Sequence, residues 1–196
     1  MGKRLFDIFF SLFGIIILSP ILLLICLLII IDSKGGIFFK QIRVGKGNKD
    51  FNIFKFRTMK TDSEKKGFLT IGNKDNRITK VGYYLRKYKL DEFPQLINVL
   101  KGDMSIVGPR PEVRKYVDMY NEQQLKVLSV RPGLTDFASI EYMNESELLS
   151  KSDKPEETYI SEIMPAKLSI NLIYIEKKSF LTDCIIIIKT IIKIIS

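Results

Sequence analysis

An adjacent pair of carboxylates and two arginines flanked by prolines are the residues of this chain best suited to chemistry. Asp91 and Glu92 stand in "KLDEFPQL" at the start of a predicted helix. Unpaired backbone N–H groups and the positive end of the helix dipole favour negative charge there. Taken alone, such a pair is usually a helix cap. Arg110 in "GPRP" and Arg131 in "VRPG" lie in loops that proline stiffens, which suits their guanidinium groups to gripping phosphate.

Lys55 and Arg57 add two further cations to this set. They alternate along a predicted strand, so we expect their side chains to share one face of it. A lone basic loop is more often solvated surface, but here several basic segments occur and prolines fix two of them. Carboxylates at a helix start, together with phosphate-binding cations, suggest phosphoryl transfer in which a divalent cation bridges carboxylate and phosphate oxygens.

Composition narrows the possible chemistry further. The 196 residues are enough for one compact domain with a core, and none of them is histidine, which removes histidine bases, histidine triads and most zinc sites. A net charge of +9 with 46% hydrophobic residues suits a protein held against an anionic surface or handling anionic ligands, with nucleic acid as the competing interpretation. Cys26 and Cys184 lie in apolar stretches, which favours buried thiols on a reducing, cytosolic side.

The elements that must position these residues begin with an apolar segment. Residues 8–31 carry no charge and could cross the roughly 30 Å hydrocarbon core of a bilayer once. Pro20 cannot donate to the carbonyl of Ile16, so the helix should kink by Ser19, whose hydroxyl can occupy backbone acceptors set free there. Physics alone leaves a kinked single span and a re-entrant helix-break-helix equally open. Basic residues flank both ends and favour keeping both on the cytoplasmic side: Lys3, Arg4, Lys34, Lys40, Arg43 and Lys46.

The C-terminal run "CIIIIKTIIKIIS" is the second apolar element. Lys189 and Lys193 stand four residues apart on one helical face, with isoleucines elsewhere. This pattern indicates an amphipathic interfacial helix whose lysines reach toward the polar headgroups. The alternative is a β-branched core strand or a packing helix.

Between these ends the pattern predicts a small mixed α+β domain. Apolar and polar residues alternate over 36–60 on both sides of a Gly/Asn/Asp cluster, as in a β-hairpin. Residues 62–76 are polar and predict a loop. Short helices are expected over 77–89 and over 91–102, where Gly102 fits the position just beyond a helix end, and a further helix over 113–130.

At these residues the sequence resembles a known family. "FKFRTM", "LDEFPQLINVLKGDMSIVGPRPE" and "VRPGLT", behind an apolar segment that contains Ser-Pro, are similar to the bacterial monotopic phosphoglycosyl transferases, also called polyprenyl-phosphate sugar-1-phosphate transferases. The motifs are long and ordered, and the resemblance is close from about Lys3 to Thr135. It implies a minimal catalytic unit without the extra transmembrane domain of longer members, on the cytoplasmic face of the bacterial inner membrane.

The resemblance also implies topology and site residues. The Ser19-Pro20 segment would be a re-entrant membrane hairpin over 1–33, followed by a catalytic domain over 34–196 on the bilayer surface. Asp91 would be the nucleophile and Glu92 would be associated with Mg²⁺. We expect both carboxylates to be metal ligands. The cations Lys55, Arg57 and Arg110 would contact phosphate, as we also expect of Arg131.

The implied reaction transfers a sugar 1-phosphate from a UDP-sugar to polyprenol phosphate through a covalent aspartyl intermediate, with release of UMP. The chain departs from commoner members after Arg131, where it reads "TDFASIEYMNES" and lacks the usual arginine. One rival function is a membrane-anchored basic binding module; aromatic residues in "YYLRKYK" favour it, but no nucleic-acid motif frames them, so we expect no nucleic-acid partner. A second rival is a phosphohydrolase with water as acceptor.

Overall fold

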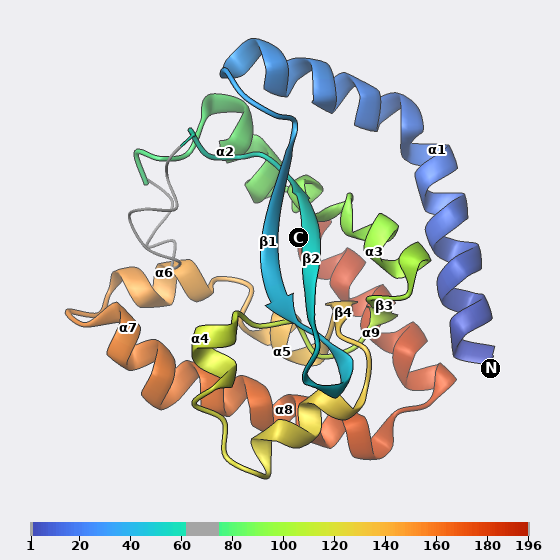
Figure 1. Cartoon of the computed structure of the whole chain (residues 1–196), viewed down its shortest axis with the longest axis vertical. Coiled ribbons are helices and arrows are strands. Elements are labelled where there is room, and N and C mark those ends of the chain that lie inside the picture. The colour runs from blue at the N-terminus through green and yellow to red at the C-terminus, as the bar shows by residue number, and fades with distance from the viewer. Residues whose placement is uncertain (1, 62–74, 196) are drawn as a thin grey trace.

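The computed structural model describes residues 2–61 and 75–195, which form a mixture of helices and short strands (Figure 1). This agrees with the expected α+β class. Most of the loop predicted over 62–76 lies outside the described residues. The elements are α1 (Gly2–Asp32), β1 (Phe38–Val44), β2 (Asp50–Phe56), α2 (Lys80–Lys87), α3 (Gln95–Lys101), β3 (Ser105–Val107), α4 (Arg114–Val117), β4 (Gly133–Thr135), α5 (Phe137–Glu141), α6 (Glu145–Ser150), α7 (Pro155–Thr158), α8 (Met164–Lys177) and α9 (Phe180–Ile195).

The predicted β-hairpin is confirmed, and it anchors α3. Strands β1 and β2 pair antiparallel, with Phe38 opposite Phe56. The side-chain amide of Asn98 in α3 donates to the carbonyl of Asn52 at 2.7 Å and accepts from the backbone N–H of Phe54 at 2.9 Å. These two bonds hold α3, and therefore the turn that precedes it, against β2.

The apolar helix α1 bends about halfway along its length (Figure 1), and Pro20 lies inside it. The hydroxyl of Ser19 donates to the carbonyl of Ile16 at 2.7 Å, which is the acceptor that Pro20 leaves without its helical partner. The predicted kink and its hydroxyl contact are therefore present. Among the described helices α1 alone is long and apolar enough to cross a membrane, and most of its side chains are exposed.

Both ends of α1 are bonded to the rest of the domain. At its start, the guanidinium of Arg4 donates to the carbonyls of Val99 and Leu100 at 2.6 and 2.9 Å. The buried carboxylate of Asp7 accepts from the hydroxyl of Ser105 at 3.0 Å. At the other end, Asp32 accepts from the first turn of α2, at the N–H of Val81. The two ends of the bent helix therefore rest on one body.

A second, two-stranded sheet was missed by the sequence analysis, which treated its segments as loops. Strands β3 and β4 pair in parallel, with Ser105 opposite Gly133. Gly108 and Gly133 pack so closely that a Cβ on Gly133 would lie 2.1 Å from the Gly108 nitrogen. This close contact brings the two Arg-Pro loops together. Neither strand could have been predicted from the sequence, because three residues are too few to show a periodic pattern.

Two helix predictions need correction. The helix expected from Asp91 begins only at Gln95, after Pro94, although Gly102 ends it in the left-handed conformation as predicted. The long helix expected over 113–130 is broken into α4 and a 3₁₀ segment, Gln124–Ser129.

The break in the second of these helices has a local cause. The side chains of Asn121 and Gln124 each accept from the other's backbone N–H at 2.9 Å. These side-chain bonds take up N–H groups that a continuous helix would have used.

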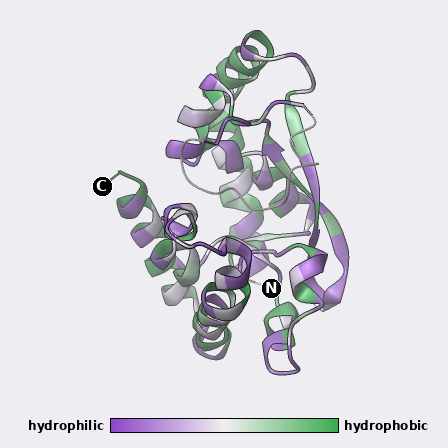
Figure 2. Ribbon diagram, turned by 90° about the vertical axis from the view of Figure 1, so that its left-hand side faces the viewer, coloured by the Kyte–Doolittle hydropathy of each residue, from purple (hydrophilic) through white to green (hydrophobic). Residues whose placement is uncertain are grey.

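The C-terminal run is a helix, α9, so the strand alternative is wrong. Its inner side holds Ile186, which is fully buried, and Asp183, which accepts from the Tyr174 hydroxyl at 2.7 Å. Its outer side exposes a row of isoleucines, and hydrophobic residues colour much of α1 and part of α9 (Figure 2). Both cysteines are free thiols, as predicted, but they are half-buried rather than fully buried.

Candidate active site

A pocket of about 580 Å³ opens between the β-hairpin, the turn before α3 and the helices α6 and α8; we call it the catalytic pocket. Lys55, Asp91, Glu92 and Arg110 all line it, although they come from three separate segments of the chain. Most of its surface is polar. The structure thus gathers four of the six side chains that the sequence analysis selected for chemistry.

Asp91 and Glu92 lie on a 3₁₀ turn, Leu90–Glu92, that enters from Lys89 in the left-handed conformation. Both carboxylates are largely buried, and Asp91 is only 7% exposed. Within the described residues Asp91 makes no side-chain hydrogen bond, so its oxygens remain available toward the pocket. The tight turn directs the Glu92 carboxylate toward two cations and leaves that of Asp91 unbonded beside the pocket.

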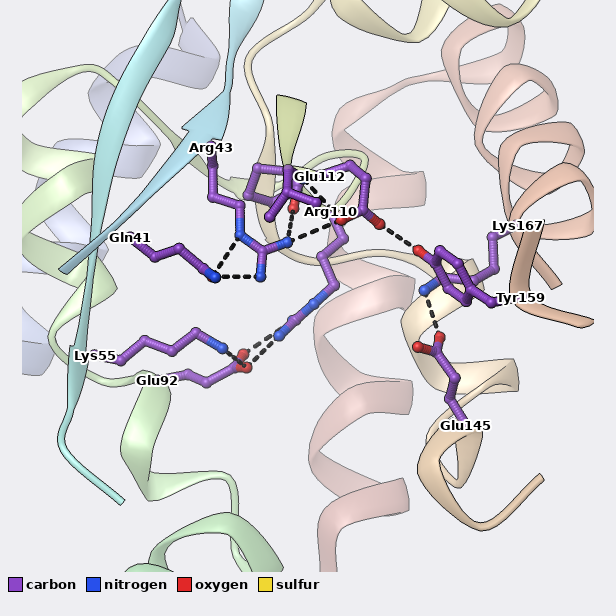
Figure 3. Close-up of polar contacts among 11 residues, drawn as sticks. Gln41, Arg43, Lys55, Glu92, Arg110, Glu112, Glu145, Tyr159 and Lys167 are labelled. Atoms are coloured by element: carbon purple, nitrogen blue, oxygen red, sulfur yellow. Dashed lines mark hydrogen bonds and ion pairs between the residues drawn. The ribbon is translucent and has the colours of Figure 1, made fainter. Parts of the chain in front are cut away.

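Glu92 is held by two cations (Figure 3). Lys55 Nζ donates to its Oε1 at 2.9 Å, and Arg110 Nη1 donates to Oε2 at 3.0 Å while Nη2 bonds Oε1. The Arg110–Glu92 contact is therefore two-pronged, the geometry in which guanidinium and carboxylate bind most strongly. Two of the four cations predicted to contact phosphate, Lys55 and Arg110, are thus bonded to Glu92 in this structure.

These contacts push the pKa values of the two carboxyls apart. Burial raises the pKa of Asp91, and the negative charge of Glu92 raises it further, against the opposing effect of Lys55. Burial also acts to raise the pKa of Glu92, but the charges and hydrogen bonds of Arg110 and Lys55 outweigh it and hold that pKa well below its usual range. Glu92 is therefore a fixed anion, whereas Asp91 is the carboxyl whose protonation can change.

Arg57 and Arg131 do not face the catalytic pocket. β2 ends at Phe56, one residue before Arg57, and the Arg57 side chain does not reach the pocket beside Lys55 as expected. Its guanidinium instead donates to the carbonyls of Ser33 and Lys34, at 2.6 and 2.8 Å, just after the end of α1. Arg131 Nε donates to the carbonyl of Gly102 at 2.8 Å. The location of these two arginines gives no support to a phosphate contact.

Two arginines of the catalytic pocket were not selected from the sequence. Arg43, on β1, donates to Glu112 and to the Pro111 carbonyl, both at 3.1 Å, and so steadies the loop that carries Arg110. Arg86, on α2, donates to the Thr58 hydroxyl at 2.9 Å and acts electrostatically on Asp91. Arg86 stands five residues before the carboxylates, and this proximity was the one signal that could have identified it.

Asp91 and Glu92 could supply only part of the coordination shell of a magnesium ion. Among the described residues there is no group of three or more carboxylate, cysteine or histidine side chains that could hold a metal. Magnesium is commonly bound by one or two carboxylates with substrate phosphate oxygens completing its shell. Asp91, with its unbonded oxygens, and Glu92 match that donor set.

The family described as bacterial sugar transferase matches residues 1–196. The chain is 38% identical, over 96% of its length, to the UDP-N-acetylgalactosamine-undecaprenyl-phosphate N-acetylgalactosaminephosphotransferase of Aeromonas hydrophila, of which it covers 42%. It is 36% identical, over 97% of its length, to the exopolysaccharide production protein PSS of Rhizobium leguminosarum bv. phaseoli, of which it covers 93%.

A third relative is the UDP-glucose:undecaprenyl-phosphate glucose-1-phosphate transferase of Escherichia coli, which is 38% identical over 78% of the chain. The chain covers 34% of that protein, and so spans less than half the length of both the Aeromonas and the Escherichia relatives. The motifs quoted from the sequence, the pocket that gathers their carboxylates and cations, and the match over the whole length agree. The chain belongs to the bacterial sugar transferase family.

Proposed function

We propose that this chain transfers a sugar 1-phosphate from a UDP-sugar to polyprenol phosphate, releases UMP and so begins the assembly of a surface glycan. One observation carries the proposal: Asp91 offers an unbonded, buried carboxylate to a cationic pocket, beside a Glu92 that two cations hold in place. The names of the relatives, which pair UDP-sugars or sugar phosphates with undecaprenyl phosphate, support the same substrates.

The proposed reaction has two displacements at one phosphorus atom. A carboxylate oxygen of Asp91 attacks the phosphorus that carries the sugar, and the bond from that phosphorus to the bridging oxygen breaks, so UMP leaves with the electron pair. A phosphate oxygen of the polyprenol phosphate then attacks the same phosphorus and displaces the carboxylate. The covalent intermediate lets two dissimilar substrates use the pocket in turn.

The neighbouring residues would serve both displacements by offsetting charge. Burial lowers the pKa of Lys55, but its pairing with Glu92 favours the charged form. Arg110, whose pKa Glu92 raises, stays cationic. A magnesium ion held by Asp91 and Glu92 would supply further neutralisation of the diphosphate. Arg86, close enough to act on Asp91, would help to keep that carboxylate ionised.

The bent helix α1 supports a re-entrant topology for this enzyme. A helix that crossed the bilayer would place Arg4 and Asp32 on opposite sides, yet both bond to the same domain, at Val99 and Val81. The helix would therefore enter and leave one leaflet from the cytoplasmic face of a bacterial inner membrane, with its exposed apolar side chains in lipid.

Helix α9 would lie along the same membrane surface. Its exposed isoleucines, such as Ile188 and Ile192, would contact lipid, while Lys193 and Ile194 line the catalytic pocket. The Lys189 Nζ lies 5.6 Å from the ring centroid of Phe137 in α5. α9 would thus place the pocket near the depth at which a polyprenol carries its phosphate.

The experiment uses wild type, Asp91→Asn and, as a matched aspartate outside the pocket, Asp118→Asn. With UDP-sugar and Mg²⁺ but no lipid, wild type and Asp118→Asn should release about one UMP per enzyme and carry a sugar phosphate on Asp91 by peptide mass analysis. Asp91→Asn should form no adduct and lose turnover by orders of magnitude.

Other outcomes separate the rival functions. UMP release that needs polyprenol phosphate and leaves no adduct would mean direct transfer between bound substrates. Full turnover without lipid would indicate a phosphohydrolase. Wild type that binds anions but releases no UMP from any UDP-sugar would indicate the basic binding module.

A further inference from the structure

The catalytic pocket has a second wall that the proposed chemistry does not use. Figure 3 shows Tyr159, Lys167 and Glu145 on the other side of Arg110 from Lys55 and Glu92. This wall, which we call the α8 wall, is formed by pocket-lining residues of α5, α6, the segment that follows α7, and α8: Ser139, Glu145, Tyr159, Lys167 and Asn171.

Asn171 is the most informative residue of the α8 wall. It is 4% exposed, yet its side-chain amide makes no hydrogen bond within the described residues, and its Oδ1 is fully enclosed. It follows Lys167 by one helical turn and so lies on the same face of α8. A buried amide without a partner is costly, whereas an apolar side chain of similar size would carry no such cost at this position.

Ser139 repeats this feature from another element. Its hydroxyl is buried without a hydrogen-bond partner among the described residues, although its backbone N–H donates to the carboxylate of Asp136, which caps α5. Two elements, α5 and α8, thus each bring one neutral, unpaired polar group to the same pocket. If the two unpaired groups were unrelated, there would be no reason for both to line the same cavity.

A buried ion pair completes the wall. Lys167 Nζ lies 2.6 Å from Glu145 Oε2, and both side chains are mostly covered. Such a pair offers one donor and one acceptor that retain bonding capacity toward a third group. An amide, a hydroxyl and an ion pair together suit a neutral ligand that carries several hydroxyl or amide groups, as a hexose or an N-acetylated hexose does.

We infer that the α8 wall binds the sugar ring of the nucleotide sugar and sets which sugar the enzyme accepts. Because Asn171 Oδ1 and Ser139 Oγ are enclosed in this structure, both side chains would have to rotate toward the sugar. Asn171 would then accept from a hydroxyl or an acetamido N–H and donate to an oxygen, and Ser139 would bond a second ring substituent. This inference rests on the proposed function. The uridine of the same substrate is the other group that an amide could read, and the experiment separates the two.

The test compares Asn171→Leu and Ser139→Ala with Ser169→Ala, a matched control whose exposed hydroxyl on α8 bonds only the Pro165 carbonyl. The KM and kcat of UMP release are measured with UDP-glucose, UDP-galactose and their N-acetylamino counterparts, and UMP itself is used as an inhibitor. Each pocket variant should raise KM for the best UDP-sugar about three- to tenfold, the loss expected for one hydrogen bond. For both pocket variants, the inhibition constant of UMP should stay within about twofold of the wild-type value. For the control Ser169→Ala, both KM and the inhibition constant of UMP should stay within about twofold of wild type.

Two results would overturn the inference. An unchanged KM would leave the wall without a role in binding, and an equal weakening of UMP would assign it to the nucleoside. Should Asn171→Leu fail to fold, as thermal unfolding would reveal, Ser139→Ala alone decides between these results. Failure of the proposed function is distinguishable, because wild type would then release no UMP from any UDP-sugar.

Discussion

Replacing Arg110 by lysine tests whether geometry or charge alone is needed beside Glu92. Arg110 makes two bonds to the Glu92 carboxylate, one through each terminal nitrogen, with Nη1–Oε2 at 3.0 Å. A lysine keeps the charge but can renew only one of these bonds. Loss of one charge-assisted hydrogen bond costs about 1.5–3 kcal/mol, which corresponds to a roughly 10- to 150-fold lower kcat/KM if the bond serves the transition state.

The assay is UMP release with UDP-sugar, Mg²⁺ and polyprenol phosphate. Arg114→Lys is the matched control, because Arg114 also pairs with a carboxylate, Asp50, but on the surface outside the pocket. The control should retain wild-type activity and unfold near the wild-type temperature. Arg110→Lys, which loses one bond to the largely buried Glu92, should unfold at a lower temperature but remain folded under the assay conditions.

A double variant asks whether Arg110 acts through Glu92. If it does, Arg110→Lys combined with Glu92→Gln should lose less activity than the product of the two single effects, since the second change removes a partner already weakened. Activity of Arg110→Lys within about twofold of wild type would refute the reasoning, because even one lost charge-assisted bond should exceed that change.

Three further predictions follow from the structure. Since burial raises the pKa of Asp91 and the reaction needs the ionised form, kcat/KM should rise with pH through a limb above the usual aspartate value of about 4. Lys55→Met should move this limb to higher pH, and a limb at or below 4 would contradict the assignment. A membrane-impermeant label should reach an N-terminal tag only from the cytoplasmic side, and periplasmic labelling of the wild-type tag would rule out the re-entrant helix. Replacing Ser19-Pro20 with Leu-Leu should straighten α1 and expose some tags to the periplasm. Arg57→Met should lower the free energy of unfolding by about 2–4 kcal/mol, because carbonyls at the end of α1 lose their donor; a change confined to UMP release, with normal stability, would instead place Arg57 in the reaction.

Much of the fold could be predicted where a pattern repeats locally. The alternation over 36–60 predicted the hairpin, and the isoleucine run with Lys189 and Lys193 predicted α9 as a helix. The kink was predictable because it depends on Pro20 and its own turn. The parallel pair β3–β4 was not, because three-residue strands have too little period and depend on a close contact between Gly108 and a segment 25 residues away.

The residue types and their order determined the chemistry of this protein by themselves. Without histidine, and with Asp91 and Glu92 beside proline-flanked arginines, the sequence alone indicated carboxylate and phosphate chemistry. Only the tertiary structure decided which cations face the catalytic pocket. Lys55 points into it, whereas Arg57, two residues later, donates to the carbonyls just after the end of α1 because those acceptors need a donor. Side-chain direction depends on such unpaired neighbours, which come from distant segments and leave no mark in the local sequence.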